Sequence, residues 1–219
     1  MTARYTLIVG TKDWSSWSLR PWLAMKVGGI PFEEVVVPLR HDDTPHHIRQ
    51  YSPSGRIPAL KISDGTSEHL VWDSLAICET IAERHPEAKL WPEAPVVRAE
   101  ARAYAAEMHS GFPDLREQLS MDFARQLPMP RLRDATKAQI ARIIEAWTQA
   151  LENHGKDGGY LFGRFSIADC MYAPVVSRFR TYGVEVPEIV QGYCDLMWSL
   201  PAMQEWGRAA KEEVDSGLA

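Results

Sequence analysis

The sequence is poor in cysteine, and its few cysteines are badly placed for cross-linking or metal binding. Among 219 residues there are three, Cys78, Cys170 and Cys194. Their number is odd, their spacings are wide, and they form no CxxC pair or zinc-like cluster, so we expect neither a disulfide framework nor a structural metal. Free cysteine is among the most frequently buried residue types, and we expect each thiol to act as a small buried hydrophobe.

Long runs of one charge sign and long apolar runs are also missing. The net charge is −5 and no run of five or more like charges occurs, which gives no electrostatic basis for binding nucleic acid. The apolar stretch before Lys12 and Asp13 is too short for a signal peptide or a membrane-spanning helix. We therefore expect a cytoplasmic protein with neither a nucleic acid nor a membrane as partner.

What is present is an ordinary globular composition, with 45% hydrophobic and 24% charged residues. The chain is long enough for one large or two modest domains. Its first part alternates strand and helix signals in the order β-α-β-α-β-β-α, with Asp64-Gly65 as a hairpin turn and Pro86 as a helix stop. The expected strands are residues 5–9, 32–39, 59–62 and 69–72, and the expected helices are 18–28, 46–51 and 73–84.

The second part of the chain is predicted to be entirely helical. Residues 85–97 carry three prolines and no clear periodicity, which indicates a linker. Beyond it, apolar residues recur at helical spacing, and Gly111 and Pro113 interrupt the first long segment. We predict an α/β domain with a small mixed sheet over residues 1–85 and an all-α domain over residues 96–219. The five expected helices of the second domain are 98–123, 133–153, 166–180, 187–200 and 202–214.

The segment Ser15-Ser16-Trp17-Ser18-Leu19-Arg20-Pro21-Trp22 stands at the start of the first expected helix. A serine before an apolar-periodic stretch is an ordinary N-cap. The same placement can bind an anion, because a hydroxyl and free backbone N–H groups meet at the positive end of a helix. Spacing alone favours capping and leaves anion binding as the alternative.

Ile57-Pro58 lies at the entry to an expected strand, where a proline costs no ladder hydrogen bond. A trans proline that simply opens the strand is one interpretation. A cis bond is the other, since it would turn the N–H and C=O groups of Ile57 outward, ready to pair with a peptide ligand. The sequence is compatible with both isomers.

Asp73-Ser74 joins an expected strand to an expected helix. Either residue can be a plain N-cap. Alternatively, the Asp73 carboxylate holds an ammonium group while the hydroxyl and N–H of Ser74 hold a carboxylate. An amino-acid end group needs both contacts, so the pair is a candidate binding site for one.

Ser166 is followed three residues later by Asp169, within Phe165-Ser166-Ile167-Ala168-Asp169-Cys170. This spacing approximates a capping box, with aspartate in place of the preferred glutamate or glutamine. We interpret it as a folding element and give it no catalytic role.

Taken in this order, the four segments resemble the glutathione transferase superfamily over nearly the whole chain. The Ser15–Ser18 segment is similar to the serine motif of zeta-like and related bacterial members, Ile57-Pro58 to the cis-proline loop, and Asp73-Ser74 to the γ-glutamyl site. Residues 165–169 resemble the helical-domain capping motif, and residues 107–112 a stretch of bacterial homologues. The resemblance implies a thioredoxin-like domain that binds glutathione and a helical domain that shapes the pocket of the second substrate.

The resemblance also implies that a serine hydroxyl keeps the glutathione sulfur ionised for attack on a small hydrophobic electrophile. Lowering a thiol pKa from about 8.5 to about 6.5 takes about 2.7 kcal/mol. One charge-assisted hydrogen bond contributes about 1.5–3 kcal/mol and a helix N-terminus about 0.3–1 kcal/mol, so no metal is needed. The zeta-like motif favours Ser15 as the donor, whereas counting back from Arg20 favours Ser16; we favour Ser15 and keep both.

Further candidate residues come from the same resemblance. His109 and Arg116 are candidates for the second-substrate pocket, with a solvated or core-edge position as the alternative. The residues expected to bind glutathione are Trp17, Ile57, Pro58, Asp73 and Ser74. Ile57 is expected to bind through its backbone. The candidates for its glycine carboxylate, among which we choose none, are Arg40, His41, His46, His47 and Arg49.

The chain departs from the family pattern at two positions. Trp17 stands where the zeta motif has cysteine, and Asp73 stands where the family usually has Glu or Gln. Three functions remain: transfer with glutathione as co-substrate, cis–trans isomerisation of the maleylacetoacetate type, and a non-catalytic glutathione-binding scaffold. The resemblance alone implies a homodimer.

Overall fold

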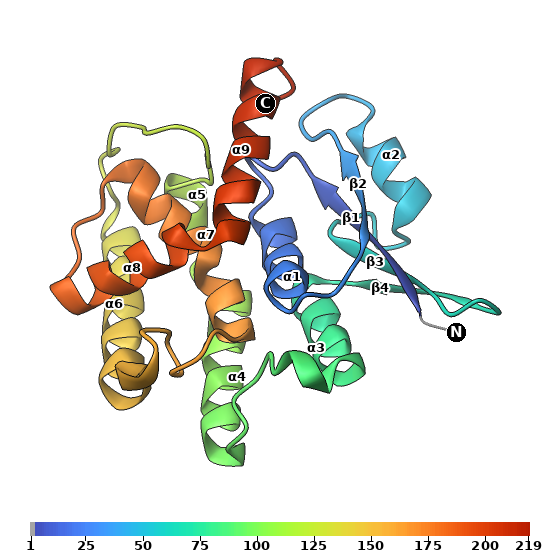
Figure 1. Ribbon diagram of the computed structural model, residues 1–219. Helices are drawn as coiled ribbons and strands as arrows, with labels where there is room; N and C mark the ends of the chain where they lie inside the picture. The colour runs from blue at the N-terminus through green and yellow to red at the C-terminus, as the bar shows by residue number, and fades with distance from the viewer. Residues whose placement is uncertain (1–2) are drawn as a thin grey trace.

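The computed structural model describes residues 3–219 and consists of an α/β unit followed by a helical unit (Figure 1). The sheet has the strand order β2-β1-β3-β4. β1 runs parallel to β2, whereas β3 is antiparallel to both β1 and β4. This mixed sheet confirms the predicted thioredoxin-like unit. Its strands are β1 Arg4–Gly10, β2 Glu33–Val37, β3 Ala59–Ser63 and β4 Glu68–Trp72.

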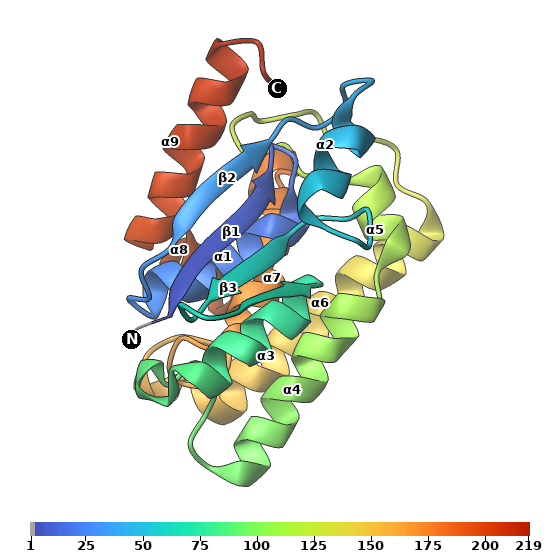
Figure 2. The same ribbon diagram turned by 90° about the vertical axis from the view of Figure 1, so that its right-hand side faces the viewer.

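Helices cover both faces of the sheet. α1 (Ser16–Val27) and α3 (Ser74–Arg84) lie between the sheet and the helical unit, whereas α2 (Thr44–Tyr51) covers the opposite face (Figures 1 and 2). Beneath α2 there is a small buried cluster of aliphatic side chains, and the much larger cluster lies on the α1 and α3 side. The β1–α1 loop and the start of α3 are therefore both held by well-packed elements.

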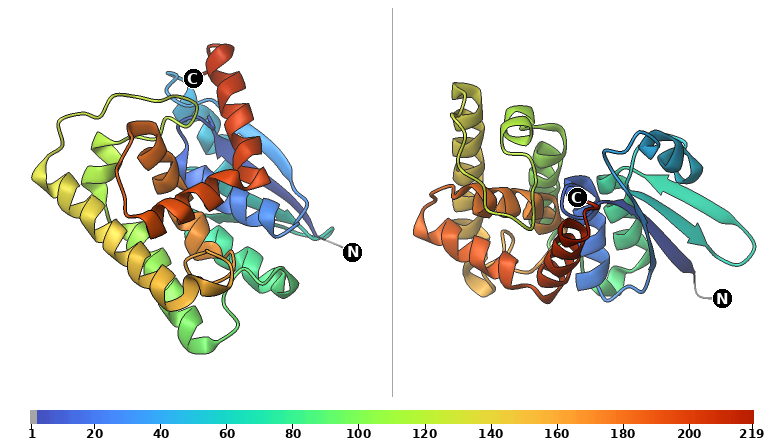
Figure 3. Two further views of the ribbon diagram at one scale, coloured as in Figure 1. Left: turned by 60° about the vertical axis from the view of Figure 1, so that its left-hand side comes forward. Right: turned by 90° about the horizontal axis from the view of Figure 1, so that it is seen from above.

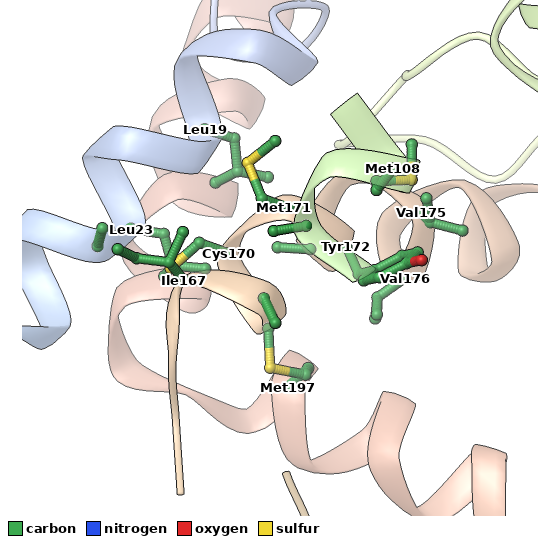
Figure 4. Packing of buried hydrophobic residues seen from close by; sticks show 14 of the residues in the cluster. Leu19, Leu23, Met108, Ile167, Cys170, Met171, Tyr172, Val175, Val176 and Met197 are labelled. Atoms are coloured by element: carbon green, nitrogen blue, oxygen red, sulfur yellow. The ribbon is translucent and has the colours of Figure 1, made fainter. Parts of the chain in front are cut away.

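The helical unit is built around α7, whose side chains are almost all buried. α7 packs against α1 of the first unit as well as against α4 and α8 (Figure 3). In Figure 4, Leu23 of α1 lies beside Ile167 and Cys170 of α7, and Leu19 lies beside Met171. One apolar core thus continues from the sheet into the helical unit. Its helices are α4 Pro95–Ser110, α5 Pro113–Gln118, α6 Asp134–His154, α7 Ile167–Tyr182, α8 Glu188–Ser199 and α9 Pro201–Asp215, and short 3₁₀ turns occupy Pro86–Ala88 and Gly155–Asp157.

The single helix predicted over residues 98–123 is wrong, because this stretch forms α4 and α5. Gly111 has extended backbone angles and Phe112 has a positive φ of 61°, so the chain turns between the two helices. Pro113 then takes the first turn of α5, where its missing N–H costs nothing. The interruption expected at Gly111 and Pro113 is real, and it makes six helices rather than five within residues 85–219.

The capping box predicted at the start of α7 is confirmed. The Asp169 carboxylate accepts the N–H of Ser166 at 2.8 Å and that of Leu161 at 3.2 Å. The three cysteines are free and buried, as expected. Within residues 3–219, no helix has the length and apolar character required to cross a bilayer.

Candidate functional site

A cleft of about 830 Å³ lies where the β1–α1 loop, the segment before β3 and the β4–α3 junction meet. Seven of the nine candidate site residues line it, namely Ser15, Ser16, Trp17, Ile57, Pro58, Asp73 and Ser74. The other lining residues are Trp14, Leu39, Ile48, Ser54, Gly55, Arg56 and Trp72. Segments far apart in the sequence are therefore brought together as the family resemblance implied.

Ser15 is the N-cap residue of α1, but its hydroxyl makes no capping hydrogen bond. It donates instead to Ser18 Oγ at 2.7 Å, and Ser18 Oγ also accepts the N–H of Gly10 at 3.1 Å. Ser18 thus ties the end of β1 to the start of α1. The N–H groups of the first turn of α1 are left without a capping side chain, so they can stabilise negative charge in the cleft.

Ser16 is the first residue of α1 and differs from Ser15 in its hydroxyl. Within the described residues, no protein group forms a hydrogen bond with the Ser16 hydroxyl, whereas the Ser15 proton is engaged with Ser18. Both serines are 6% exposed and both line the cleft. Ser16 can therefore donate to a ligand without breaking a bond, and Ser15 can do so by exchanging Ser18 for the ligand.

The Ile57–Pro58 peptide bond is cis, which decides between the two isomers that the sequence left open. Both residues line the cleft immediately before Ala59, the first residue of β3. Ala59 is opposite Ile8 of β1 and Trp72 of β4, so the central strand of the sheet fixes the position of this segment.

Asp73 has a strained backbone, and its two carboxylate oxygens have different partners. Its φ of 79° lies in the left-handed region, which is uncommon for a residue with a side chain and frequent at functional sites. Oδ1 accepts the N–H of Leu75 at 2.9 Å and caps α3, while Oδ2 lies 3.3 Å from His109 Nε2. Asp73 is therefore an N-cap whose second oxygen lies between the cleft and the helical unit.

His109 and Arg116 do not line the cleft but lie beside Trp17, which does. The His109 ring meets the Trp17 ring edge-on at 5.3 Å, and the Arg116 guanidinium lies 4.8 Å from the same ring. Burial lowers the pKa of His109 more than the Asp73 carboxylate raises it, so His109 is mainly neutral at pH 7. The two residues support Trp17 and Asp73 from the side of the helical unit.

Comparison with known proteins connects this geometry to a family. A model of the glutathione S-transferase N-terminal domain matches residues 14–84, and one of the C-terminal domain matches residues 130–209. A probable maleylacetoacetate isomerase from Caenorhabditis elegans is 32% identical over 172 residues, which is 78% of this chain and 77% of the relative. The chain belongs to the glutathione transferase superfamily.

Other relatives of this superfamily member fall into two named groups. The maleylacetoacetate isomerase of Pseudomonas aeruginosa is 29% identical over 87% of this chain and 90% of its own, and glutathione S-transferase omega-1 of Mus musculus is 26% identical over 90% and 76%. Among solved structures, a glutathione transferase homologue from Burkholderia with bound glutathione has a TM-score of 0.71 at 24% identity, covering 95% of this chain and 98% of its own. It shares the fold.

Several residues of the cleft were not identified from the sequence. Trp14 and Trp72 line the cleft, and each directly precedes a residue that was a candidate, Ser15 or Asp73. Their position next to candidate residues was the one signal in the sequence that could have identified them. Arg40 lies 4.0 Å from the Trp14 ring at the cleft margin. The remaining candidates for the glycine carboxylate, none of which is among the lining residues, are His41, His46, His47 and Arg49.

Proposed function

We propose that this protein catalyses glutathione transfer: the cleft binds glutathione, and its thiolate attacks a small hydrophobic electrophile. The observation that carries the proposal is that the hydroxyls of Ser15 and Ser16, at the open N-terminus of α1, line the same cleft as Ile57 and Asp73. Relatives named as glutathione S-transferases and a structural neighbour with bound glutathione support it. Residues 1–85 would hold glutathione, and residues 96–219 would complete the pocket of the second substrate.

Each wall of the cleft has a distinct role in this proposal. The backbone of Ile57, beside Pro58, pairs with the cysteinyl unit of glutathione, and Trp17 borders the sulfur site. The Asp73 carboxylate receives the γ-glutamyl ammonium, and the hydroxyl and N–H of Ser74 receive the α-carboxylate. The ammonium then faces a carboxylate of opposite charge, and the carboxylate of the ligand faces two hydrogen-bond donors.

The transfer step needs only the proposed thiolate and the electrophile. The thiol proton leaves to water, and the sulfur is stabilised by the serine hydroxyls and the first-turn N–H groups of α1. With an aryl chloride, a sulfur lone pair forms the C–S bond while the C–Cl bond breaks and chloride leaves. The serine bond is stronger to the thiolate than to the thiol, which is why it favours the reactive form.

The test compares Ser15→Ala and Ser16→Ala with wild type, using an activated aryl chloride as electrophile. We expect kcat/KM to fall by about tenfold or more in at least one variant, because a hydrogen bond to a charged group contributes about 1.5–3 kcal/mol. The thiol pKa of bound glutathione, followed by thiolate absorbance, should rise in the same variant. Ser199→Ala, an exposed position at the end of α8, is the matched control.

Two outcomes would contradict the transferase proposal. If neither serine variant changes the rate or the thiol pKa, these hydroxyls do not activate the sulfur. If wild type binds glutathione tightly but turns over no electrophile, the non-catalytic scaffold is the better description.

A second candidate is glutathione-dependent cis–trans isomerisation, favoured by the relatives from Caenorhabditis elegans and Pseudomonas aeruginosa that are named as maleylacetoacetate isomerases. The thiolate would add to one carbon of a cis double bond, the resulting single bond would rotate, and the thiolate would leave again, with no net change in atoms. Conversion of maleylacetoacetate by the same set of variants is the test. No glutathione-dependent conversion by wild type would reject this candidate.

We also propose that His109 and Arg116 border the second-substrate pocket and that the protein is a homodimer. The two side chains lie behind Trp17, on the helical side of the cleft. The dimer rests on the family resemblance. Light scattering measures it directly, and a monomer at micromolar concentration would contradict it.

A further inference from the structure

Three arginines lie close together at the boundary between the two units without a carboxylate partner. Arg20 and Arg178 are 1% and 4% exposed, and Arg116 is half-buried. Within residues 3–219, none of the three forms an ion pair with an aspartate or glutamate. The Asp73 carboxylate forms no ion pair with Arg20, although its charge raises the pKa of Arg20. Burying a cation without a partner is costly, so each of the three requires an explanation.

Two of them, Arg116 and Arg178, donate to backbone carbonyl groups at the end of a helix. Arg116 donates to the carbonyls of Met108, His109 and Gly111 at the end of α4. Arg178 donates to the carbonyl of Leu119, just after α5. Carbonyl groups at a helix C-terminus lack partners within the helix and carry partial negative charge, so they compensate the charge of these two guanidinium groups, although Nη1 of Arg116 is buried without a hydrogen bond.

Arg20 has no such partner. Its Nε is buried without a hydrogen bond, and its one side-chain contact with a polar group is from Nη1 to Ser74 Oγ at 3.5 Å. The guanidinium lies 4.3 Å from the Trp17 ring. Burial, followed by repulsion from Arg116 and Arg178, lowers the pKa of Arg20 to about 9. Among the described residues, Arg20 is thus the one guanidinium of the three that donates to no backbone carbonyl and has no carboxylate partner.

The contact with Ser74 shows where a compensating anion would lie. Ser74 is the first residue of α3, is 1% exposed, and lines the cleft. Because Ser74 Oγ accepts from Arg20, its own proton is free to be donated into the cleft. An anion placed there would receive the O–H and N–H of Ser74, since Asp73 already accepts the next two N–H groups of α3, and would also be attracted by the Arg20 charge behind Ser74.

We propose that Arg20 is a positioning residue that holds Ser74 as a donor for the γ-glutamyl α-carboxylate of glutathione. The inference rests on the proposed function, since it takes glutathione as the ligand of the cleft. Arg20 would then help the protein to distinguish glutathione from thiols that lack an α-carboxylate at this end. Its contribution acts on binding, so it is independent of whether transfer or isomerisation follows.

The test measures binding by calorimetry for two ligands: glutathione, and γ-aminobutyryl-cysteinyl-glycine, which lacks only the α-carboxylate. Arg20→Met should weaken the binding of glutathione by about tenfold and leave that of the analogue within about twofold. Ser74→Ala should show the same pattern, and Arg20→Met combined with Ser74→Ala should lose little more than either alone, because the two act on one carboxylate. Arg180→Met, an exposed position on α7, is the control expected to change neither.

The outcomes separate this inference from the proposed function. If wild type binds neither ligand, glutathione is not the ligand and both proposals fail. If wild type prefers glutathione to the analogue but Arg20→Met weakens both equally, Arg20 has only a structural role and this inference alone fails. Should Arg20→Met not fold, Arg20→Lys takes its place: a selective loss of about threefold for glutathione supports the proposal, and an equal loss for the two ligands overturns it.

Discussion

Ser18 is the residue that fixes the candidate catalytic end of α1. It is fully buried, and its Oγ accepts from both the N–H of Gly10 and the hydroxyl of Ser15. Ser18→Ala leaves the buried N–H of Gly10 without an acceptor, so we expect the free energy of unfolding to fall by about 1–3 kcal/mol. Urea unfolding monitored by circular dichroism measures this loss.

Ser15→Ala is the matched comparison for Ser18→Ala. It removes a donor but keeps the bond between Gly10 and Ser18, so we expect a smaller loss of about 0.5–1.5 kcal/mol. Equal losses in the two variants would show that the bond to Gly10 contributes nothing to stability.

At the scale of single residues, the sequence indicates which residues line the cleft better than it indicates the partner of each side chain. Serine at a helix start, proline at a strand entry and aspartate at a helix start are local patterns, and these residues do line the cleft. The partner of each side chain is a different matter. Nothing in the local sequence indicates that Asp73 meets His109, 36 positions later, or that Arg20 meets Ser74, 54 positions later. Such pairs depend on the packing of α1, α3 and α4.

At the N-terminus of α7, Asp169 is expected to make the stability of the protein depend on pH. Asp169 is fully buried, and burial raises its pKa to about 6 although the N–H groups of Leu161 and Ser166 lower it. A carboxyl group whose pKa is raised on folding binds a proton more tightly in the folded state. Its contribution to stability is therefore greatest near pH 4 and is lost as the pH rises through about 6.

The variant Asp169→Asn removes this titration and nearly preserves side-chain volume. Between pH 7 and pH 5, we expect wild type to gain about 1 kcal/mol of unfolding free energy relative to the variant. Urea unfolding of both proteins at pH 7, 6 and 5 measures the difference. A constant difference across these pH values would mean that Asp169 keeps an ordinary carboxyl pKa in the folded protein.

At the scale of elements, the sequence was informative where a local signal exists. The strands, the hairpin and α3 follow from alternation, turn residues and the proline after the helix. Gly111 and Pro113 indicated an interruption between α4 and α5. The sequence did not indicate that the interruption would separate two helices. Phe112 adopts a positive φ where glycine is usual, and the Arg116 guanidinium holds the end of α4 from the next helix. The conformation of Phe112 and a side chain of the following helix thus mark the end of α4 where periodicity would continue it.

At the scale of the whole molecule, the C-terminal helix holds the loop that leads into the candidate site. Trp206 Nε1 of α9 donates to the carbonyl of Lys12 at 2.9 Å, and Glu213 accepts the N–H of Asp13 at 3.1 Å. Lys12 and Asp13 directly precede the Trp14–Trp17 segment of the cleft. The two contacts join residues that are 194 and 200 positions apart, a separation at which sequence pattern carries no information.

The continuous core makes a prediction about how the two units unfold. α1 packs against α7 in one buried cluster that reaches from the sheet to the helical unit, so the units are expected to unfold together. Trp206→Phe keeps a ring against Trp22 but removes the bond to Lys12. We expect it to lower the free energy of unfolding by about 1–3 kcal/mol, with fluorescence and circular dichroism still reporting one transition.

The same variant should weaken glutathione binding, because the loop before Ser15 loses one of its two anchors to α9. Trp198→Phe is the control, since Trp198 of α8 stacks on Phe123 and is not bonded to the loop. It should lower stability without changing the dissociation constant for glutathione, measured by calorimetry. If Trp206→Phe and Trp198→Phe lose stability alike and both keep the wild-type affinity, α9 only packs against the loop. If Trp206→Phe alone loses affinity, α9 helps to hold the N-terminus of α1 in the position that binds glutathione.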